Sequence, residues 1–549
     1  MTELQSIVIS IILSFASPAW GHLESGLFDA LWHDRAIVVL DSSINIVAQP
    51  TTLEKSGEWV TVSWQASNSY GINATKNAPV KYQYAYYSST HMSYGKGSIS
   101  FRLMNMRQSV IFGFFKGGTN NPVLQAVSNS VEFANPNEPL QGHLALTNDP
   151  SQMIFTWVTK DAQKPMVLWG TDSGRYPNIA QASSFTYGAK DMCGSPAIDF
   201  GFRDPGMIHQ ATLKSLTPGQ TYYYIFGDAY GWSSEYNFKA APYPGSSDPV
   251  TIIAYGDMGC AELDDSYMAQ TVKASLNTTK RIQEQLDKID FVLQIGDISY
   301  ALGYSSVWDV YFDQLEPIAT RVPYMVGIGN HERNYPNTMP GYYNNSGSGG
   351  ECGIPHELRF PMPTPALDEP WYGFDYGSAH VVIMSTEHQF TPGTAQYKFL
   401  ESHLKNVDRN VTPWLIFGGH RPMYIASKDS GYPDGHNSVA YALRNSLEPL
   451  LKEYKVDLAL WAHIHAYQRT CAVYQETCVD GGIPHVVIGM AGRNLANCLP
   501  SSLPSWLVYY DHKSYGYSRI TVNTSTLVFE YIHSDDNVVY DSLVLKKSM

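Results

Sequence analysis

The chain has 549 residues, of which 44% are hydrophobic and 16% charged, and its formal net charge is −14. This length exceeds what one hydrophobic core usually serves, so we expect a globular protein of about three domains. An acidic chain without extended basic runs is a poor match for nucleic acid or an anionic membrane surface, which excludes both as principal partners.

The N-terminus is predicted to be a signal peptide covering residues 1–19. Its apolar run, Ile7–Phe15, is too short to span a bilayer, and Ser17–Ala19 forms a small-residue cleavage site before Trp20. The segment before the run carries Glu3 and no lysine or arginine. The alternative interpretation is therefore a first buried strand.

Other features agree with export. Five glycosylation sequons begin at Asn73, Asn277, Asn344, Asn410 and Asn523. Six cysteines permit disulfides, and Cys471 lies close enough to Cys478 to close a small loop, whereas the other pairings stay open. No later run is long enough to span a membrane, and the C-terminus carries no lipid-anchor or retention signal. We expect a secreted, extracellular protein or one delivered to a vacuole or lysosome.

The first half of the chain alternates polar and apolar residues in short runs such as "EWVTVSWQA" and "MIFTWVTK". Alternation with this spacing, interrupted by Gly, Pro, Asn and Asp, is typical of antiparallel β-sandwiches. It predicts two sandwich domains of the immunoglobulin or fibronectin III type, at residues 20–137 and 138–245. The linkers "FANPNEPLQG" and "KAAPYPGSSDP" would follow these domains.

After Pro249 the pattern changes to continuous apolar runs separated by helix-like segments. The runs are "VTIIAYGD", "DFVLQIGD", "VPYMVGIGNH", "PWLIFGGH" and "VDLALWAH". Such strands indicate sheets covered on both faces, in which ligands bind beyond the carboxyl ends of the strands. The fold class expected is thus multidomain α+β, with a catalytic domain at 246–549 that includes a C-terminal region at about 484–545.

Each of the five runs ends in polar residues. In an extended segment, side chains two apart point to the same side, so His463 and His465 should reach one shared space. Taken singly, these residues have ordinary explanations, such as helix caps for the two aspartates or a turn at Asn330. The candidate site residues are Asp257, Asp297, Tyr300, Asn330, His331, His420, His463 and His465. Oxygen and imidazole donors without thiolates suit two metal ions that share a carboxylate.

The string "GDMG…GDISY…GNHE…GGH…HIH" resembles the five-block pattern of the purple acid phosphatases, within the calcineurin-like metallophosphoesterases. The likeness covers nearly all of the mature chain. Segments such as "LEPIATRVPYMVGIGNHE" are similar to the large plant-type members, which include nucleotide pyrophosphatase/phosphodiesterases. The resemblance implies a four-layer α/β/β/α catalytic domain.

Carried over by motif position, the resemblance implies a binuclear centre with one Fe(III) and one divalent ion, Zn, Mn or Fe, per subunit. The ferric ligands would be Asp257, Tyr300 and His465. The divalent ligands would be Asn330, His420 and His463, and Asp297 would bridge the ions. The two neighbouring histidines would thus serve different ions.

The function implied is acid phosphatase activity: hydrolysis of phosphate monoesters by attack of a metal-bound hydroxide on phosphorus. The substrate would be a phosphorylated small molecule. His331, which is not a ligand in the family, is the candidate to orient phosphate or to protonate the leaving group. The alternative for His331 is a supporting role in which it holds Asn330.

Two departures from the family pattern leave the substrate open. Ala462 and Gln468 stand where the last block has Gly and Glu, and neither is a ligand position. The smaller plant enzymes also carry substrate-binding histidines after the block of His420, where this chain offers only His436, with Arg421 and Tyr424 nearer. Hydrolysis of a nucleotide pyrophosphate or a diester is therefore the second interpretation.

Two further alternatives come from other functional classes. One is a secreted β-sandwich binding protein with an inactive phosphoesterase domain. The other is a mononuclear zinc peptidase, although the HExxH motif fails because Tyr335 occupies its last position. The remaining histidines, such as His209, His380 and His485, are assigned to packing or surface roles, and a homodimer is left open.

Overall fold

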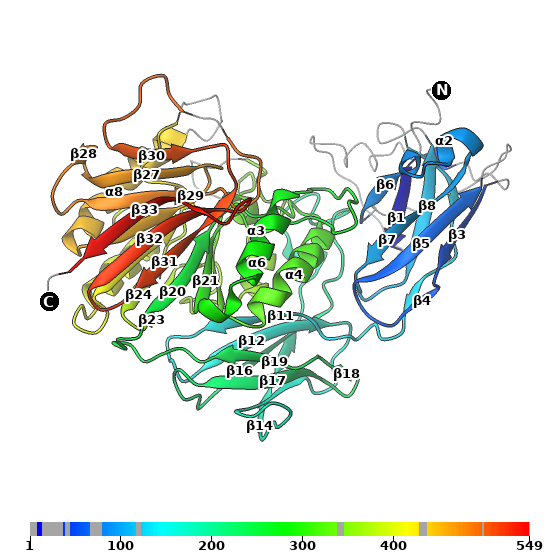
Figure 1. The fold of residues 1–549 in the computed structure, drawn as a ribbon, viewed down its shortest axis with the longest axis horizontal. Helices are drawn as coiled ribbons and strands as arrows, with labels where there is room; N and C mark the ends of the chain where they lie inside the picture. The colour runs from blue at the N-terminus through cyan, green and yellow to red at the C-terminus, as the bar shows by residue number, and fades with distance from the viewer. Residues whose placement is uncertain are drawn as a thin grey trace.

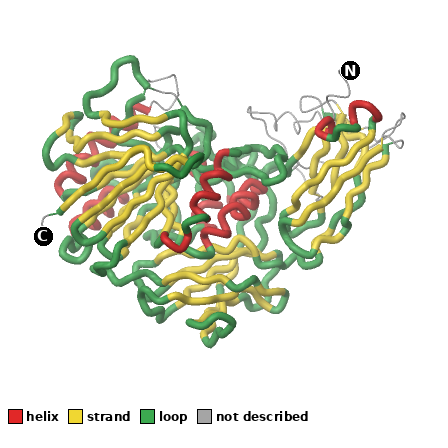
Figure 2. Tube along the Cα trace, in the orientation of Figure 1, coloured by secondary structure: helices red, strands yellow, loops and turns green. Residues whose placement is uncertain are grey.

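The computed structural model describes residues 8–13, 37–38, 44–65, 80–116, 122–337, 345–427, 436–496 and 499–547. Three strand-rich units follow one another along the chain (Figure 1). The first two lie beside and below the third, and helices of the third unit occupy the space between its sheets and the other two units (Figure 2).

The N-terminal unit is a β-sandwich. One sheet has the order β2-β9-β8-β1-β6, and the other is β3-β5-β7. Their bounds are β1 Val8–Leu13, β2 Ile37–Val38, β3 Asn45–Gln49, β5 Glu58–Gln65, β6 Tyr82–Tyr84, β7 Lys96–Leu103, β8 Val110–Lys116 and β9 Val123–Val127. The short β4 Thr52–Leu53 pairs with β10 Glu132–Phe133, and η2 Ala85–Tyr87 and α2 His91–Tyr94 follow β6. Strand β5 buries every second residue, as its alternating sequence predicts.

The predicted signal segment lies partly within this sandwich. Val8–Leu13 forms β1, which pairs antiparallel with both β6 and β8. This is the arrangement that the alternative interpretation, a first strand, predicts. The proposed cleavage site at Ser17–Ala19 lies outside the described residues, so processing of the N-terminus stays a prediction.

The second unit is also a sandwich of two antiparallel sheets. Its sheets are β11-β12-β16-β15 and β14-β13-β17-β18, with β19 beside β17. The bounds are β11 Leu140–Leu146, β12 Met153–Thr159, β13 Met166–Gly170, β14 Asn178–Gln181, β15 Ser183–Phe185, η3 Ala189–Asp191, β16 Met207–Leu213, β17 Thr221–Asp228, β18 Gly231–Trp232 and β19 Tyr236–Lys239. Aromatic rings such as Phe155 and Phe226, with centroids 4.6 Å apart, fill the space between the sheets.

The third unit contains two larger sheets. The first has the order β22-β21-β20-β31-β32-β33 and the second β23-β24-β25-β26-β29-β27-β28, with β30 beside β27. The bounds in the first sheet are β20 Val250–Tyr255, β21 Phe291–Ile295, β22 Tyr324–Gly327, β31 Gly516–Val522, β32 Thr526–His533 and β33 Val539–Lys546. Those in the second are β23 Tyr372–Tyr376, β24 Ala379–Ile383, β25 Trp414–Gly419, β26 Leu458–Trp461, β27 Tyr467–Tyr474, β28 Thr477–Cys478, β29 Ile483–Ile488 and β30 Leu507–Asp511. Strands β20, β21 and β22 are parallel to one another, as are β24, β25, β26 and β29.

Helices cover the outer face of each sheet. They are α3 Ala274–Gln283, η4 Leu286–Lys288, α4 Ser305–Ala319, α5 Asn330–Arg333, α6 Ile354–Arg359, α7 Ala395–Lys405 and α8 His436–Glu453. In β20, Ile252 joins the core between the sheets, whereas Ile253 joins the core that includes α4. Leu415 of β25 packs in the same way with α7 and α8. The four-layer α/β/β/α domain after β-sandwich units is therefore confirmed, and none of the described helices is long and apolar enough to cross a bilayer.

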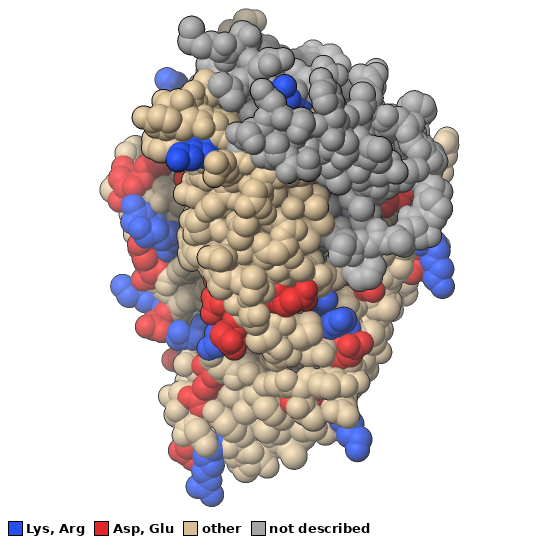
Figure 3. Space-filling view, turned by 90° about the vertical axis from the view of Figure 1, so that its right-hand side faces the viewer, with Lys and Arg blue, Asp and Glu red and all other residues tan. Residues whose placement is uncertain are grey.

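Contacts between the first and third units hold the chain segment that follows β20. Tyr82 and Tyr267 form an antiparallel β-bridge. The buried ammonium group of Lys81 lies 2.9 Å from Glu262 and 2.8 Å from Asp264. These buried ion pairs link two segments that lie far apart in the sequence. On the side of the molecule seen in Figure 3, acidic and basic side chains are mixed beside and below a broad area of uncharged residues.

Two disulfides are present among the described cysteines. Cys471–Cys478 closes the small loop that the spacing predicts. Cys193–Cys352 joins the second unit to the third, a pairing that the sequence leaves open. Cys260 is buried with a free thiol. Disulfides of this kind persist in oxidising compartments.

The sequons differ in accessibility. Asn410 is exposed and Asn523 is partly exposed. The Asn277 amide nitrogen donates to Ser534 O at 2.9 Å and to Asp535 Oδ1 at 3.1 Å, hydrogen bonds that an attached glycan would disrupt. Asn73 and Asn344 lie outside the described residues, and glycosylation of all five stays a prediction.

Burial of Glu351 predicts a pH-dependent stability. Glu351 is 2% exposed, and its two carboxyl oxygens accept from Trp308 Nε1 at 3.0 and 3.2 Å. Burial raises its pKa from 4.5 to about 8, although the indole N–H opposes the shift. The folded protein keeps this proton at pH values where the unfolded chain has released it. The free energy of unfolding should therefore fall as pH rises from 4.5 to about 8.

The expected contribution is on the order of a few kcal/mol, since each pKa unit corresponds to about 1.4 kcal/mol. Glu351→Gln retains an oxygen for the indole and cannot titrate. Thermal unfolding across this pH range should thus show a shallower loss of stability in Glu351→Gln than in the wild type. Parallel curves for the two proteins would rule out Glu351 as the source.

Candidate metal centre

The predicted site residues follow the carboxyl ends of five parallel strands. Asp257 follows β20, Asp297 follows β21, and α5 begins at Asn330 after β22. His420 follows β25, and His463 and His465 follow β26. Because the two sheets are stacked with these ends at the same edge of the domain, segments separated by up to two hundred positions meet there. Seven of the eight side chains form two adjoining groups, and the eighth, His331, lies beside both.

The first group consists of Asp257, Tyr300 and His465. Tyr300 Oη donates to Asp257 Oδ1 at 2.9 Å and lies 3.0 Å from His465 Nε2. His465 Nε2 is 3.3 Å from Asp257 Oδ1. Three donor atoms at these separations can contact one ion at ordinary metal–ligand distances.

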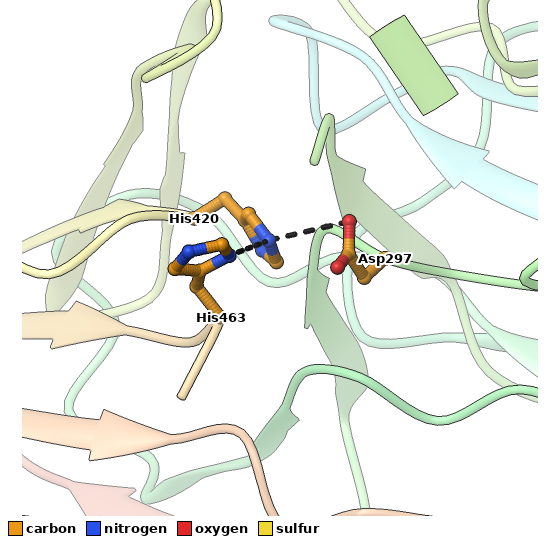
Figure 4. A group of neighbouring side chains, drawn as sticks. All are labelled: Asp297, His420 and His463. Carbon is orange, nitrogen blue, oxygen red and sulfur yellow. Dashed lines mark hydrogen bonds and ion pairs between the residues drawn. The ribbon is translucent and has the colours of Figure 1, made fainter. Parts of the chain in front are cut away.

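The second group is centred on His420. Its Nε2 lies 3.2 Å from Asp297 Oδ1, 3.1 Å from Asn330 Oδ1 and 3.3 Å from His463 Nδ1. Figure 4 shows Asp297 and His463 on opposite sides of His420, each directed toward its ring. The ligand atoms of Asp297, His420 and His463 all lie within 4.8 Å of one another.

Backbone carbonyls orient two of the imidazoles. His420 Nδ1 lies 3.0 Å from Ile295 O, and His465 Nδ1 lies 2.9 Å from Asn494 O. A carbonyl accepts only from a protonated nitrogen, so when either ring is neutral its lone pair is on Nε2. Each lone pair therefore points into the donor group.

The segment that carries His463 and His465 is not the extended strand that we predicted. β26 ends at Trp461, and His463 has a φ of 67°, in the left-handed region. Ile464 N donates to Ala462 O at 2.7 Å, and Ala466 N donates to Ile464 O at 2.6 Å. Two consecutive tight turns therefore separate the imidazoles. These turns direct His463 toward His420 and His465 toward Tyr300.

Left-handed backbone conformations recur among the candidate ligands. The φ values are 57° at Asp257, 48° at Asp297, 55° at Tyr300 and 67° at His463. Each non-glycine residue in this region costs about 1–3 kcal/mol and persists only where its surroundings enforce it. Such strain is common at functional sites, and no sequence pattern that we considered indicates it.

The glycines of the "GD" and "GN" pairs make room for the ligand side chains. A Cβ at Gly329 would lie 2.3 Å from Asp297 Oδ1, and one at Gly296 would lie 2.5 Å from His420 Nδ1. Gly296 also has a φ of 76°. Any larger residue would displace a candidate ligand, which explains why glycine precedes the polar residue in these runs.

Glu332 is an important residue that the sequence analysis missed. It is 1% exposed, and its carboxylate accepts backbone N–H groups from Gly329 at 2.9 Å, Asp297 at 2.9 Å and Ile298 at 2.7 Å. Glu332 thereby ties the loop after β21 to the loop after β22. The sequence signal for Glu332 is its place in "GNHE", where the glutamate itself was considered only as part of a peptidase motif.

The electrostatics of the site fit bound cations. Asp257 is fully buried and Asp297 is 1% exposed, and among the described residues no lysine or arginine lies within 4.0 Å of either carboxylate. Burial alone would raise the pKa of Asp297, but His420 and His331 lower it below its usual range. Buried carboxylates require a compensating charge, and hard and borderline metal ions match these oxygen and nitrogen donors.

Tyr300 also fits a site for a cation. Burial, followed by the charges of Asp257 and Asp297, raises the pKa of its phenol well above 10. Without a nearby positive ion the phenol therefore keeps its proton, which it donates to Asp257. A bound cation would favour the phenolate, because a metal acidifies the groups that it coordinates.

His331 lies beside the two groups rather than within either. Its Nδ1 is 2.8 Å from Gly347 O, its Nε2 is 3.8 Å from Asp297 Oδ2, and its ring centroid is 4.7 Å from that of Tyr300. Burial lowers its pKa, although Asp297 opposes this shift. Its side chain is 27% exposed, so a substrate can reach Nε2.

The two departures from the family pattern are accommodated by neighbouring residues. Ala462 is fully buried and packs against Gly256, which follows β20. A Cβ at Gly256 would lie 2.3 Å from the Ala462 Cβ, so the methyl group of Ala462 fits because Gly256 has no side chain. Gln468 Oε1 accepts from Ala426 N at 2.9 Å and holds the segment after His420.

The structure describes the side chains of two of the three residues that the sequence offers after His420. Tyr424 is 1% exposed, and its hydroxyl bonds to Glu448 and to Glu476 N, so it belongs to the core. Arg421 Nε donates to Glu387 Oε1 at 2.8 Å, and its Nη1 lies 3.4 Å from His463 Nε2. The side chain of His436 is not among those described.

A cavity of about 490 Å³ lies away from the candidate ligands, at the amino end of β24. It is lined by His380 and His403, whose Nε2 atoms are 2.9 Å apart, while His380 Nδ1 is 2.6 Å from Asp375 Oδ1. His209 and His485 are buried and hydrogen-bonded to Thr159 and Trp461, respectively, in agreement with packing roles.

Comparisons with known proteins match segments of all three units. Family models match for the Fn3-like domain from purple acid phosphatase at residues 55–135, the purple acid phosphatase N-terminal domain at 139–240, the calcineurin-like phosphoesterase at 250–467 and the iron/zinc purple acid phosphatase-like protein C at 482–542. A protein of Arabidopsis thaliana named probable inactive purple acid phosphatase 1 is 41% identical over 492 residues, covering 86% of this chain and 79% of that protein. The chain belongs to the purple acid phosphatase family.

A solved purple acid phosphatase from yellow lupin (Lupinus luteus) seeds has the same fold as this family member. The TM-score is 0.85 at 38% identity, with 92% of this chain and 96% of the lupin chain covered. A nucleotide pyrophosphatase/phosphodiesterase of Hordeum vulgare is 42% identical over 328 residues, covering 58% of this chain and 88% of that protein. These matches confirm the resemblance that the five motifs indicate, and place the chain among the metallophosphoesterases.

Proposed function

We propose that this purple acid phosphatase family member is an active binuclear-metal phosphatase that hydrolyses phosphate monoesters at acid pH. The observation that carries the proposal is the pair of donor groups, which holds a suitable side chain at all seven proposed ligand positions. It is built around buried carboxylates that have no lysine or arginine partner among the described residues. Hydrolysis of a nucleotide pyrophosphate at the same site is the second candidate, supported by the likeness to the barley protein.

The residues suited to each ion follow the two groups. Asp257, Tyr300 and His465 would hold Fe(III), because carboxylate and phenolate oxygens suit a hard trivalent ion. Asn330, His420 and His463 would hold Zn, Mn or Fe in the divalent state, and Asp297 would serve both ions. When bound, such ions act as Lewis acids on a phosphate group and lower the pKa of the attacking water.

His331 would supply the proton chemistry from the protein. Its Nδ1–H is committed to Gly347 O, so Nε2 can donate only when the ring is protonated. Protonated Nε2 would then hydrogen-bond a phosphate oxygen or protonate the leaving oxygen. Because burial lowers the pKa of His331, this form requires acid pH, which agrees with the proposed acid optimum.

The inactive alternative must be weighed, because the Arabidopsis relative bears the name "probable inactive". The complete donor set favours an enzyme over a β-sandwich binding protein, since a domain without catalysis has no need to maintain strained backbone at four candidate ligands. The zinc peptidase has no further support, because Glu332 is engaged with three backbone N–H groups.

We also propose secretion, or delivery to a vacuole or lysosome. The two disulfides support an oxidising compartment. A cleaved signal peptide and N-linked glycans belong to this proposal, whereas a homodimer is left open. N-terminal sequencing of the secreted protein tests the cleavage before Trp20.

Metal analysis combined with an activity assay tests the proposed function. The purified protein should contain about two metal ions per chain, with iron and a second metal in similar amounts, and a visible absorption band from a ferric phenolate. It should hydrolyse p-nitrophenyl phosphate at pH 5 and lose this activity when a chelator removes the metals. A metal-loaded protein without turnover would support the binding protein instead.

A further inference from the structure

Arg493 lies beside the candidate metal centre and is not part of any motif that the sequence analysis identified. It follows β29, and its backbone N donates to Asp257 O at 2.9 Å. Its guanidinium carbon lies 4.7 Å from the centre of the Tyr300 ring. The backbone contact with one candidate ligand and the ring contact with another fix Arg493 at the edge of the site.

The guanidinium group is held by a neutral partner. Its Nη1 donates to Gln270 Oε1 at 2.8 Å, and among the described residues no carboxylate lies within 4.0 Å of it. Other arginines of the same domain have acidic partners: Arg333 with Asp368, Arg421 with Glu387 and Arg469 with Asp541. Arg493 is also partly exposed, so its charge is oriented but available to a ligand.

The position of this charge indicates which part of a ligand it would bind. The hydroxyl end of Tyr300 contacts Asp257 and His465, whereas Arg493 stacks against the face of the ring. The guanidinium therefore lies beside the donor atoms rather than among them. An anion bound there would be next to a phosphate held at the metal centre. Guanidinium groups bind phosphate oxygens in pairs, a geometry that lysine cannot reproduce.

We propose that Arg493 is a specificity-determining residue: where a substrate carries a second phosphate group on the leaving-group side, the Arg493 guanidinium binds that group and thereby sets how strongly the site favours a phosphoanhydride over an ester with a single phosphate. This inference rests on the proposed function. In the reaction, the oxygen of water bonds to the reacting phosphorus and the bridging P–O bond breaks. The leaving phosphate keeps the electron pair, and the protons of water pass to the products. Arg493 would stabilise the charge that develops on the leaving phosphate.

Calorimetric binding of two non-reacting ligands tests the inference without turnover. Wild-type protein loaded with metal should bind methylenediphosphonate about 10- to 100-fold more tightly than inorganic phosphate, the range expected for hydrogen bonds to a charged group. Arg493→Gln should lose this preference while its affinity for phosphate changes by less than about 3-fold. Arg493→Lys should restore part of the preference, because it keeps the charge without the paired geometry.

Arg519→Gln is the matched control, since Arg519 pairs with Glu530 on strands β31 and β32, outside the site. It should bind both ligands as the wild type does. Gln270→Ala is a second test, because it keeps the Arg493 guanidinium and removes the oxygen that holds it. This variant should weaken binding of the diphosphonate but not of phosphate. If Arg493→Gln and Gln270→Ala weaken both ligands equally or neither, the inference is wrong.

Two outcomes separate this inference from the proposed function. If the wild type binds phosphate and hydrolyses p-nitrophenyl phosphate but binds the diphosphonate no more tightly, only the role of Arg493 fails. If the metal-loaded wild type binds neither ligand and hydrolyses nothing, the proposed function fails, and the role of Arg493 fails with it.

Discussion

Asp297→Asn is expected to lower phosphatase activity by about 10³-fold or more and to reduce the metal content of the purified protein. Asp297 Oδ1 accepts from His331 N at 2.9 Å and lies 3.2 Å from His420 Nε2. Asparagine keeps the shape and an oxygen for the backbone N–H, but it removes the charge that both proposed ions would share. Losing several kcal/mol of Lewis-acid stabilisation corresponds to a rate loss of that size, at 1.36 kcal/mol per factor of ten.

The measurement is kcat/KM for p-nitrophenyl phosphate together with metal content by elemental analysis. Asp375→Asn is the matched control. Asp375 is also a carboxylate that pairs with a histidine, His380, but this pair lies at the amino end of β24, away from the candidate ligands. It should behave as the wild type in both measurements. Wild-type metal content and activity in Asp297→Asn would contradict the proposed role of the bridging carboxylate.

Glu332→Ala is expected to destabilise the fold by about 3–9 kcal/mol and to reduce metal binding as well. The change leaves three buried N–H groups, those of Gly329, Asp297 and Ile298, without their acceptor. Each unsatisfied buried donor costs about 1–3 kcal/mol. Because one of these groups belongs to Asp297 itself, the left-handed backbone at that residue loses the contact that supports it.

Denaturant unfolding of the metal-free protein measures the stability change, and calorimetric titration with Zn²⁺ measures the affinity change. Glu332→Gln should lie between the wild type and alanine, since glutamine offers one acceptor oxygen where the carboxylate offers two. Glu284→Ala, which removes a surface partner of Arg281, should cost less than about 1 kcal/mol. An alanine variant as stable as the wild type would show that water or a shifted backbone satisfies these groups.

Periodicity predicted correctly which strands are covered on one face and which on both, for a simple physical reason. Strands β20, β21, β25 and β26 are buried on both faces, so their sequences are continuously apolar, whereas β5 alternates because one of its faces is exposed. Polar residues at the ends of apolar runs stand out against this background. The convergence of the candidate ligands could therefore be predicted from the order of the runs alone.

Local geometry at the site was not predictable in the same way. The extended path expected through His463 and His465 is wrong, because the chain makes two tight turns there and adopts a left-handed φ at His463. Intrinsic preference disfavours such a conformation, and the contacts of His463 with Asp257 and His420 override it. The disulfide between Cys193 and Cys352 was equally hidden, since it depends on how two units pack.

The sequence by itself determined the types of donor atom, their order along the chain and the sheet edge at which they emerge, because burial patterns and strand ends are local properties. The family resemblance already implied how the donors divide into two groups. Only the tertiary structure decided that tight turns separate the last two histidines, that Glu332 holds the loops together and that Arg493 stands beside the donors. These features arise from packing between distant segments. The energy of such contacts depends on distances in space that residue order does not specify.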